Sequence, residues 1–284
     1  MSEYINWLYF FHAWGFAPRY AAIAQVHDCQ ACRAAWINSF PLAEQAKAKE
    51  AIKLIDDARK LLDEMDGKLP CRCLFKLCSA NADGDNLLID GIVFPLLRQQ
   101  IEHEEGKPYL CLSDFIKPIE SHQPDTLGVF AASVDDTEWQ QTDDAYRKLL
   151  IQTLSDRLVE AAVEKMHQYV RKEAWGYTPN ENLSINELLQ EQFQGIRPAV
   201  GYPSLPDQSV NFIIGQLIDL GQIGITLTEN GAMNPHASVS GLMLAHPQAR
   251  YFAVGKIGED QLKDYSQRRG LSVETMRKFL AANL

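Results

Sequence analysis

The 284-residue sequence lacks the signatures of the common cofactor-dependent and nucleophilic enzymes. No expected strand is followed by G-x-G-x-x-G, and the patterns G-x-x-x-x-G-K-[ST], H-E-x-x-H and G-x-S-x-G do not occur. These absences argue against conventional dehydrogenases, P-loop NTPases, zinc metalloproteases and α/β-hydrolases.

The chain also lacks an excess of positive charge. Its formal net charge is −10 and its pI is near 5.2, whereas nucleic acids and anionic membrane surfaces bind basic faces. The N-terminal stretch MSEYINWLYFFHAWGF is short, and it is acidic rather than basic ahead of its apolar run. It therefore resembles neither a signal peptide nor a transmembrane span. We expect a cytoplasmic protein with no nucleic-acid partner and no membrane partner.

The six cysteines do not form a recognisable metal-binding pattern. Cys29 and Cys32 make a C-x-x-C preceded by His27, but no second C-x-x-C and no H-x-x-x-H completes a tetrahedral set. Without a signal peptide, disulfides are not expected either. We therefore predict reduced thiols and no metal. A metal-binding or redox protein that uses His27, Cys29 and Cys32 remains the second alternative.

No linker, low-complexity tract or internal repeat interrupts the chain, and 46% of its residues are hydrophobic. Periodicity and capping patterns predict helices over 41–66 with Ser39 as cap, over 142–172, from the capping box at 184–187 to Gly195, after Asp207 as far as Gly221, and over 258–270 and 272–284. Strand patterns occupy 71–78, 108–116, 126–134, 224–229, 237–244 and 249–257, and the stretch ANADGDNLLI at 80–89 predicts a hairpin turn that leads into the next strand.

The strands cluster and the helices segregate, without β-α-β alternation, which predicts an α+β fold: an antiparallel, bent sheet with helices packed around it. We expect one domain over 1–284, with a helical part at 1–67 and a sheet and ligand-binding part at 68–284.

One irregular loop carries chemistry of its own, the stretch GIRPAVGYPSLPD at 195–207. Arg197 offers a planar fork suited to a carboxylate or phosphate. The prolines of the loop stiffen the backbone, Gly201 permits a ligand to approach the main chain closely, and Tyr202 offers a flat face. The loop suits an anionic or zwitterionic small ligand with a planar group. Considered without context, a surface loop whose arginine pairs with a neighbouring acid is favoured over this.

Several segments carry a resemblance that covers nearly the whole chain. They are YINWLYFFHAW, LRQQ, YLCLSDFI, DRLVEAAVEKMH, VRKEAWGYTPNENLS, QGIRPAVGYPSLPD, LTENGAMNPHASVSG, HPQARYFAVGKI and DQLKDYSQRRGLS, in this order. The chain closely resembles the S-adenosylmethionine-binding activation domain at the C-terminus of cobalamin (vitamin B12)-dependent methionine synthase. The R-x-x-x-G-Y motif of that family falls on Arg197, Gly201 and Tyr202.

The resemblance implies a set of ligand contacts. Arg197 would hold the methionine carboxylate, while two acids on the long helix would face the ligand and the cobalamin module: Glu160 at the ligand and Asp156 at the partner. The implied S-adenosylmethionine-binding set is Asn6, Glu160, Arg197, Pro198, Ala199, Gly201, Tyr202 and Tyr251. Read from spacing alone, Asp156, Glu160 and Glu164 instead indicate a solvated helix face.

The sequence departs from the family at three points. Asn6 stands where the family has aspartate, Gln208 where it has histidine, and Asn234 where it has tryptophan. No D-x-H-x-x-G motif for a cobalamin-ligating histidine is present. We therefore expect a free-standing activation domain, serving a split methionine synthase or another corrinoid protein.

The resemblance implies that the protein presents the methyl group of S-adenosylmethionine to Co(I) cobalamin on a partner module during reductive reactivation, with an electron from a flavodoxin-type donor. Such a component of a methyltransferase is not expected to turn over alone. The first alternative is a non-catalytic docking module for a corrinoid protein, with weak or no S-adenosylmethionine binding.

Overall fold

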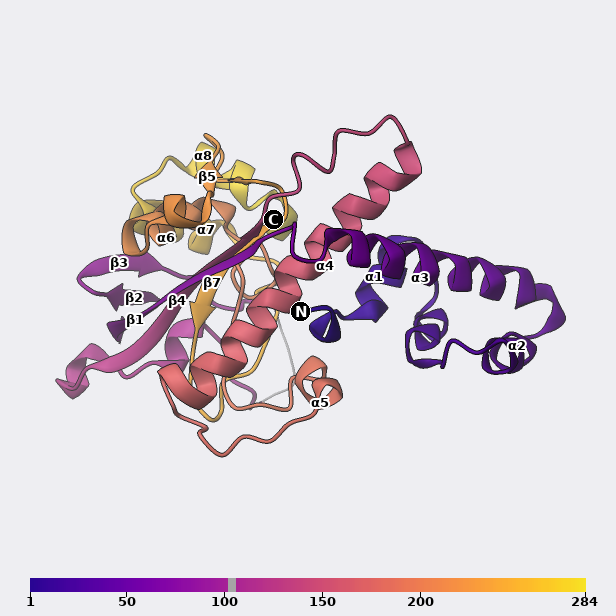
Figure 1. Cartoon of the computed structure of the whole chain (residues 1–284). Coiled ribbons are helices and arrows are strands. Elements are labelled where there is room, and N and C mark those ends of the chain that lie inside the picture. Colours follow the sequence, from indigo (N-terminus) through magenta and orange to yellow (C-terminus); the bar gives the residue numbers. More distant parts are fainter. Residues whose placement is uncertain (102–105) are drawn as a thin grey trace. The chain divides into compact units, whose positions relative to one another are not determined.

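The computed structural model describes residues 1–101 and 106–284 (Figure 1). The α-helices are α1 Trp7–Ala13, α2 Gln30–Asn38, α3 Gln45–Met65, α4 Ala145–Tyr169, α5 Ile185–Leu189, α6 Asn211–Leu217, α7 Glu259–Arg269 and α8 Val273–Phe279. The strands are β1 Cys71–Asp83, β2 Asn86–Ile89, β3 Ile92–Pro95, β4 Asp125–Val134, β5 Thr226–Leu227, β6 Met233–Asn234 and β7 Ser238–Met243.

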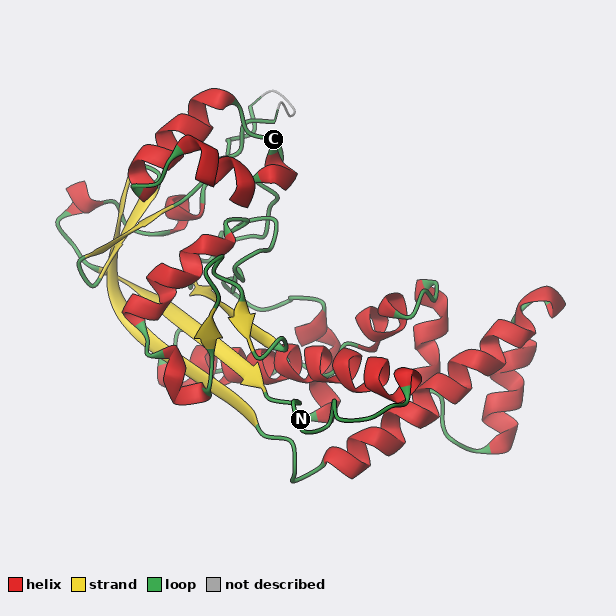
Figure 2. Cartoon of the chain, turned by 90° about the horizontal axis from the view of Figure 1, so that it is seen from above, coloured by secondary structure: helices red, strands yellow, loops and turns green. Residues whose placement is uncertain are grey.

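Five of the strands form one curled antiparallel sheet in the order β3-β2-β1-β4-β7, and the chain has an α+β fold as predicted (Figure 2). The hairpin between β1 and β2 turns where Asp83 pairs with Asn86, within the stretch 80–89 for which a hairpin turn was predicted. β7 pairs with β4 from Gly128 opposite Met243 to Ser133 opposite Ser238. β5 and β6 form a separate two-stranded ribbon.

The chain divides into two compact units. The first unit comprises Met1–Arg72, Val134–Lys165 and Pro235–Ala237, and the second comprises Cys73–Ser133, Met166–Asn234 and Ser238–Leu284. The helix α4 begins in the first unit, and its last four residues belong to the second.

The first unit is built around the amphipathic helix α3. Its buried stripe recurs every three or four residues and consists of Ala48, Ala51, Leu54, Ile55, Ala58, Leu61 and Met65. Aromatic side chains fill the space beside it, among them the edge-to-face pair Phe10–Phe11, whose ring centres lie 5.6 Å apart. Tyr146 Oη on α4 donates a 2.8 Å hydrogen bond to Asp57 on α3, which fixes the two helices of this unit side by side.

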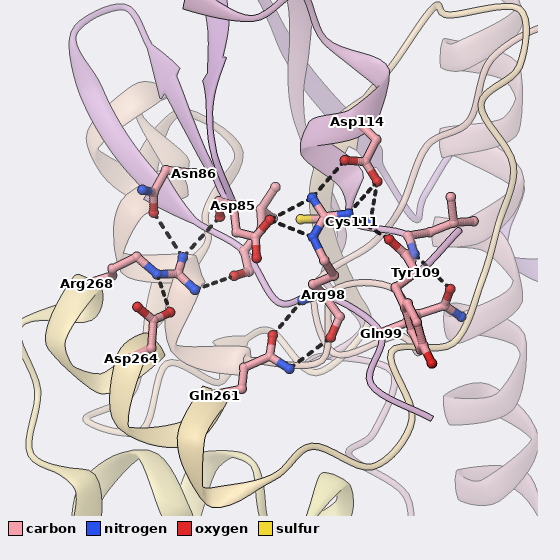
Figure 3. Close-up of polar contacts among 12 residues, drawn as sticks. Asp85, Asn86, Arg98, Gln99, Tyr109, Cys111, Asp114, Gln261, Asp264 and Arg268 are labelled. Atoms are coloured by element: carbon pink, nitrogen blue, oxygen red, sulfur yellow. Dashed lines mark hydrogen bonds and ion pairs between the residues drawn. The ribbon is translucent and has the colours of Figure 1, made fainter. Parts of the chain in front are cut away.

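The second unit buries the inner face of the sheet under α6 and the segments around it. A polar cluster ties its hairpin β2–β3 to α7 (Figure 3). The guanidinium of Arg98 donates to Asp85 and, in bidentate fashion, to Asp114 at 2.7–2.8 Å. Arg268 on α7 donates to the main-chain oxygens of Asp85 and Leu96, both at 3.0 Å. The segments LRQQ and DQLKDYSQRRG thus meet here as structural partners.

Two predicted strands do not form. In 108–116, residues Leu112–Phe115 make a 3-10 turn because the Asp114 carboxylate accepts the Cys111 amide. In 249–257, the backbone hydrogen bonds go to scattered partners rather than to one strand: Val254 N–H bonds Pro203 and Ile257 N–H bonds Asn283, each at 2.8 Å. Alternating apolar residues in both segments serve burial without a ladder.

Several helix ends also differ from prediction. Ser39 follows α2 rather than capping α3. The capping box of Ser184 and Glu187 is present, but α5 ends at Leu189 instead of Gly195. Asp207 caps a 3-10 turn, after which α6 stops at Leu217, short of Gly221. Within residues 1–101 and 106–284, no helix combines the length and the apolar character needed to cross a bilayer.

Candidate functional site

The arginine-bearing loop at 195–207 lies along the free edge of β7 and its continuation. Ile196 exchanges two backbone hydrogen bonds of 2.9 Å with Leu244, the Val200 amide donates to Ser240, and the Leu242 amide donates to the Pro198 carbonyl. The loop therefore extends the sheet by one irregular edge, which explains how a proline-rich segment satisfies its backbone.

A glycine on β7 allows the loop to lie this close to the sheet. A Cβ built on Gly241 would lie 2.2 Å from the Pro198 carbonyl oxygen and 2.9 Å from both the Ala199 Cα and the Phe130 ring. The neighbouring atoms belong to the backbone or to a buried ring, so they cannot move aside without a loss of stability. Gly241 is thus the position that sets how closely the loop approaches the sheet, and the sequence alone did not single it out.

Tyr251 and Gly201 hold the two ends of the segment 197–201, which begins with Arg197. The Arg197 amide donates a 3.0 Å hydrogen bond to Tyr251 Oη. Gly201 adopts φ +86°, a left-handed conformation that favours glycine, and its amide donates to the Leu205 carbonyl at 2.8 Å. Tyr202 is about half exposed beside this turn. The Arg197 backbone and Tyr251 are thus in direct contact, and Tyr202 lies five residues further along the same loop.

The far end of the loop is anchored by Asp207, which is 1% exposed. Its carboxylate accepts hydrogen bonds from the Ser209 amide and hydroxyl, from Tyr265 Oη at 2.8 Å and from Arg269 at 3.2 Å. Burial and the neighbouring Asp207 charge raise the pKa of Tyr265 well above its ordinary value. Asp207 is thus a structural anchor for the loop.

Buried polar groups support the near end of the loop. Arg171 is fully buried, pairs with Glu181 through two 2.8 Å hydrogen bonds and lies 4.0 Å above the Phe193 ring. His167 is also fully buried, in edge-to-face contact with Phe193. Burial, followed by the charges of Arg171 and Arg197, lowers the pKa of His167 well below its ordinary range. A neutral imidazole thus shares the environment of the loop's arginine.

In the first unit, the acids of α4 are not a solvated face, so that interpretation of the spacing is wrong. Glu164 is 4% exposed, and Asp156 and Glu160 are half-buried. Burial raises the pKa of Asp156, while His236, whose Nδ1 lies 3.3 Å from its carboxylate, acts in the opposite direction. Asn6 caps α1, its side-chain oxygen accepting the Leu8 amide at 3.1 Å.

The structure shows two further features outside the implied ligand-binding set. Glu191, six residues before Arg197, has φ 58°, and non-glycine residues in this region concentrate at functional sites. In the first unit, His27, Cys29 and Cys32 lie together, with one potential ligand atom of each within 4.8 Å of the others. The backbone angle of Glu191 is visible only in the structure, whereas the C-x-x-C spacing after His27 was already apparent in the sequence.

Comparison with known proteins identifies the family of this chain. The sequence model of the family described as "Vitamin B12 dependent methionine synthase, activation domain" matches residues 1–270. A crystal structure of the MetH reactivation domain bound to AdoHcy superimposes with a TM-score of 0.84 and 36% sequence identity, covering 100% of this chain and 86% of the other. The chain belongs to the activation-domain family of vitamin B12-dependent methionine synthase.

Proposed function

We propose that this protein binds S-adenosylmethionine and presents its methyl group to Co(I) cobalamin on a partner module, during the reductive reactivation of a cobalamin-dependent methionine synthase. The cobalamin belongs to the partner, and a flavodoxin-type protein donates the electron. The protein's own share is positioning, because holding reacting atoms in line turns a bimolecular encounter into an effectively unimolecular one. It would act as a component of the methyltransferase and not turn over alone.

The observation that carries the proposal is the arginine loop fastened to β7 by main-chain hydrogen bonds and to Tyr251 by the Arg197 amide. The related reactivation domain was crystallised with AdoHcy, the species left when S-adenosylmethionine loses its methyl group. In this proposal the Arg197 guanidinium binds the methionine carboxylate, and Tyr202 and Tyr251 line the ligand.

The remaining loop residues would act mainly through shape. The Gly201 amide and the Pro198 carbonyl already bond within the second unit, so they define the wall of the site rather than supply new hydrogen bonds. Ala199, a small residue that is 8% exposed, leaves room beside Arg197. The loop would therefore offer one strong charged contact on a rigid floor.

On α4, Glu160 would interact with the cationic end of the ligand, and Asp156 would accept a hydrogen bond from the partner module. Their i, i+4 spacing places both carboxylates on one helix face. Asp156 already has an imidazole partner in His236. A partner histidine would therefore bond the second carboxylate oxygen or displace His236.

A docking module that binds S-adenosylmethionine weakly or not at all is the second candidate. Asn6 favours it, because a neutral amide that caps α1 replaces the family's aspartate and offers the ligand's ammonium no charge. The two functions share the docking step and differ in ligand affinity.

Calorimetric titration of the wild type with S-adenosylmethionine distinguishes them. We expect binding, and we expect Arg197→Ala to weaken it by about 1.5–3 kcal/mol, the cost of a charge-assisted hydrogen bond. Arg250→Ala, an exposed arginine beside Tyr251, serves as the control and should bind like the wild type. Absence of heat and of thermal shift at millimolar ligand would leave the docking function as the better account.

A further inference from the structure

The first unit holds a cluster of soft metal ligands remote in sequence from the residues above. His27, Cys29 and Cys32 each present a ligand atom, and these three atoms lie within 4.8 Å of one another. His27 and Cys29 are exposed, Cys32 is half-buried, and none of the cysteines in the described residues forms a disulfide. Nothing in the proposed methyl transfer uses this cluster.

The N-terminus of α2 orients the two thiols. Cys29 is the N-cap residue of this nine-residue helix, and its sulfur accepts the Cys32 amide at 3.2 Å. An amide donor directed at sulfur stabilises a thiolate, which is the form that ligates metals. The spacing of N-cap and third helical position also turns both sulfur atoms toward the same side of the first helical turn.

The imidazole closes the third side of the cluster. The Cys29 amide donates to His27 Nδ1 at 3.2 Å, so the ring already folds back over the cysteine. A metal bound at this nitrogen would replace a single long hydrogen bond. The ring therefore lies within reach of a shared ion without any rearrangement of α2.

Ion pairs connect the segment that carries the cluster to α3. Asp28, between His27 and Cys29, pairs with Arg59 on α3 at 2.7 Å and with Arg33 on α2 at 3.1 Å. Arg33 also donates two 2.6 Å hydrogen bonds to the Asp56 carboxylate on α3. The intervening charges are thus paired, and the backbone that carries the ligands is fixed to a long helix, which is what a preorganised site requires.

We propose that His27, Cys29 and Cys32 bind one soft divalent cation, Zn²⁺ foremost, with a fourth coordination position open to solvent or to an external thiolate or imidazole. Two thiolates and an imidazole are zinc ligands, and three protein ligands with one open position are typical of non-structural zinc sites. Each thiol releases its proton on binding, and the two thiolate charges neutralise the ion. Spacing alone predicted no metal, because it shows no fourth ligand; the open position removes that requirement.

The test is titration of the full chain, reduced with a phosphine and freed of metal, with Zn²⁺ against a chromophoric chelator. We expect one equivalent to bind. Cys29→Ser and Cys32→Ser should each weaken binding by about 100-fold, and His27→Asn by at least about tenfold. Serine is a good N-cap, so Cys29→Ser keeps the helix start while removing the ligand.

Cys73→Ser, at an exposed cysteine of β1, is the matched control and should bind like the wild type. Titration with Co²⁺ adds a spectroscopic readout: a sulfur-to-cobalt charge-transfer band that disappears in Cys29→Ser and changes when free imidazole fills the open position. The proposal is overturned if the reduced wild type binds no stoichiometric Zn²⁺, or if Cys73→Ser loses as much affinity as Cys29→Ser.

Discussion

The two compact units hold their candidate ligand residues by different means. In the second unit, Arg197 sits on a segment without regular structure, and its position depends on main-chain hydrogen bonds to β7 and on one tyrosine hydroxyl. In the first unit, Asp156 and Glu160 lie on a 25-residue helix, and helical geometry alone aligns them. The position of a loop residue therefore depends on distant hydrogen-bond partners, whereas the spacing of two residues on a helix is set by the helix itself.

The largest effect should come from disturbing the seat of the loop. Gly241→Ala forces a methyl group against the Pro198 carbonyl and should cost about 1–3 kcal/mol of stability, the usual cost of overpacking. The displaced loop should also lose S-adenosylmethionine binding, measured by calorimetry. Gly215→Ala is the control, since its added Cβ meets only Leu220 at an ordinary 3.6 Å within α6. Ligand binding that survives Gly241→Ala would place the ligand away from this loop.

The helix acids should separate binding from transfer. If Glu160 binds the cationic end of the ligand as proposed, Glu160→Gln should weaken S-adenosylmethionine binding by roughly 1.5–3 kcal/mol. Asp156→Asn should spare that affinity and slow transfer of labelled methyl to the cobalamin of a partner module in the presence of a reduced flavoprotein. Equal effects of both variants on S-adenosylmethionine affinity would contradict the separate roles proposed for Asp156 and Glu160.

A smaller gain is expected at the cap of α1. Asn6→Asp keeps a good N-cap, so thermal stability should change little. If the ligand's ammonium lies nearby, the new charge should tighten S-adenosylmethionine binding by about 1 kcal/mol, seen in the same titration. Unchanged affinity would mean that Asn6 is remote from the ammonium.

The last expected effect concerns pH. Because the pKa of buried His167 is lowered in the folded state, its neutral form favours folding above the unfolded pKa, and this contribution is lost as pH falls below about 6.5. Between pH 6.5 and 5.5 the loss is at most about 1.4 kcal/mol. His167→Gln should flatten the dependence of the melting temperature on pH, whereas the exposed His12→Gln should not.

Local patterns in the sequence were enough for the elements whose residues determine their own structure. The stripe of α3, the hairpin at 83–86, the strand β4 and the capping box of Ser184 and Glu187 all follow from periodicity or from a few adjacent residues. The motif R-x-x-x-G-Y likewise pointed to the loop that carries Arg197. These features depend on neighbours within about one helical turn, which a sequence displays directly.

Tertiary structure alone decided the features whose causes are distant in sequence. The segment 249–257 became irregular because its amides found partners in the loop and at the C-terminus, and Glu164 became buried although its spacing suggested solvent. Gly241 matters because Pro198, some forty residues earlier, lies against it. Ion pairs between Asp28 and Arg59 and between Arg33 and Asp56 hold the segment of His27 and Cys29 on α3, which the C-x-x-C spacing does not reveal. Long-range packing and hydrogen bonding determine such positions, and the local sequence does not indicate which distant segment a residue will contact.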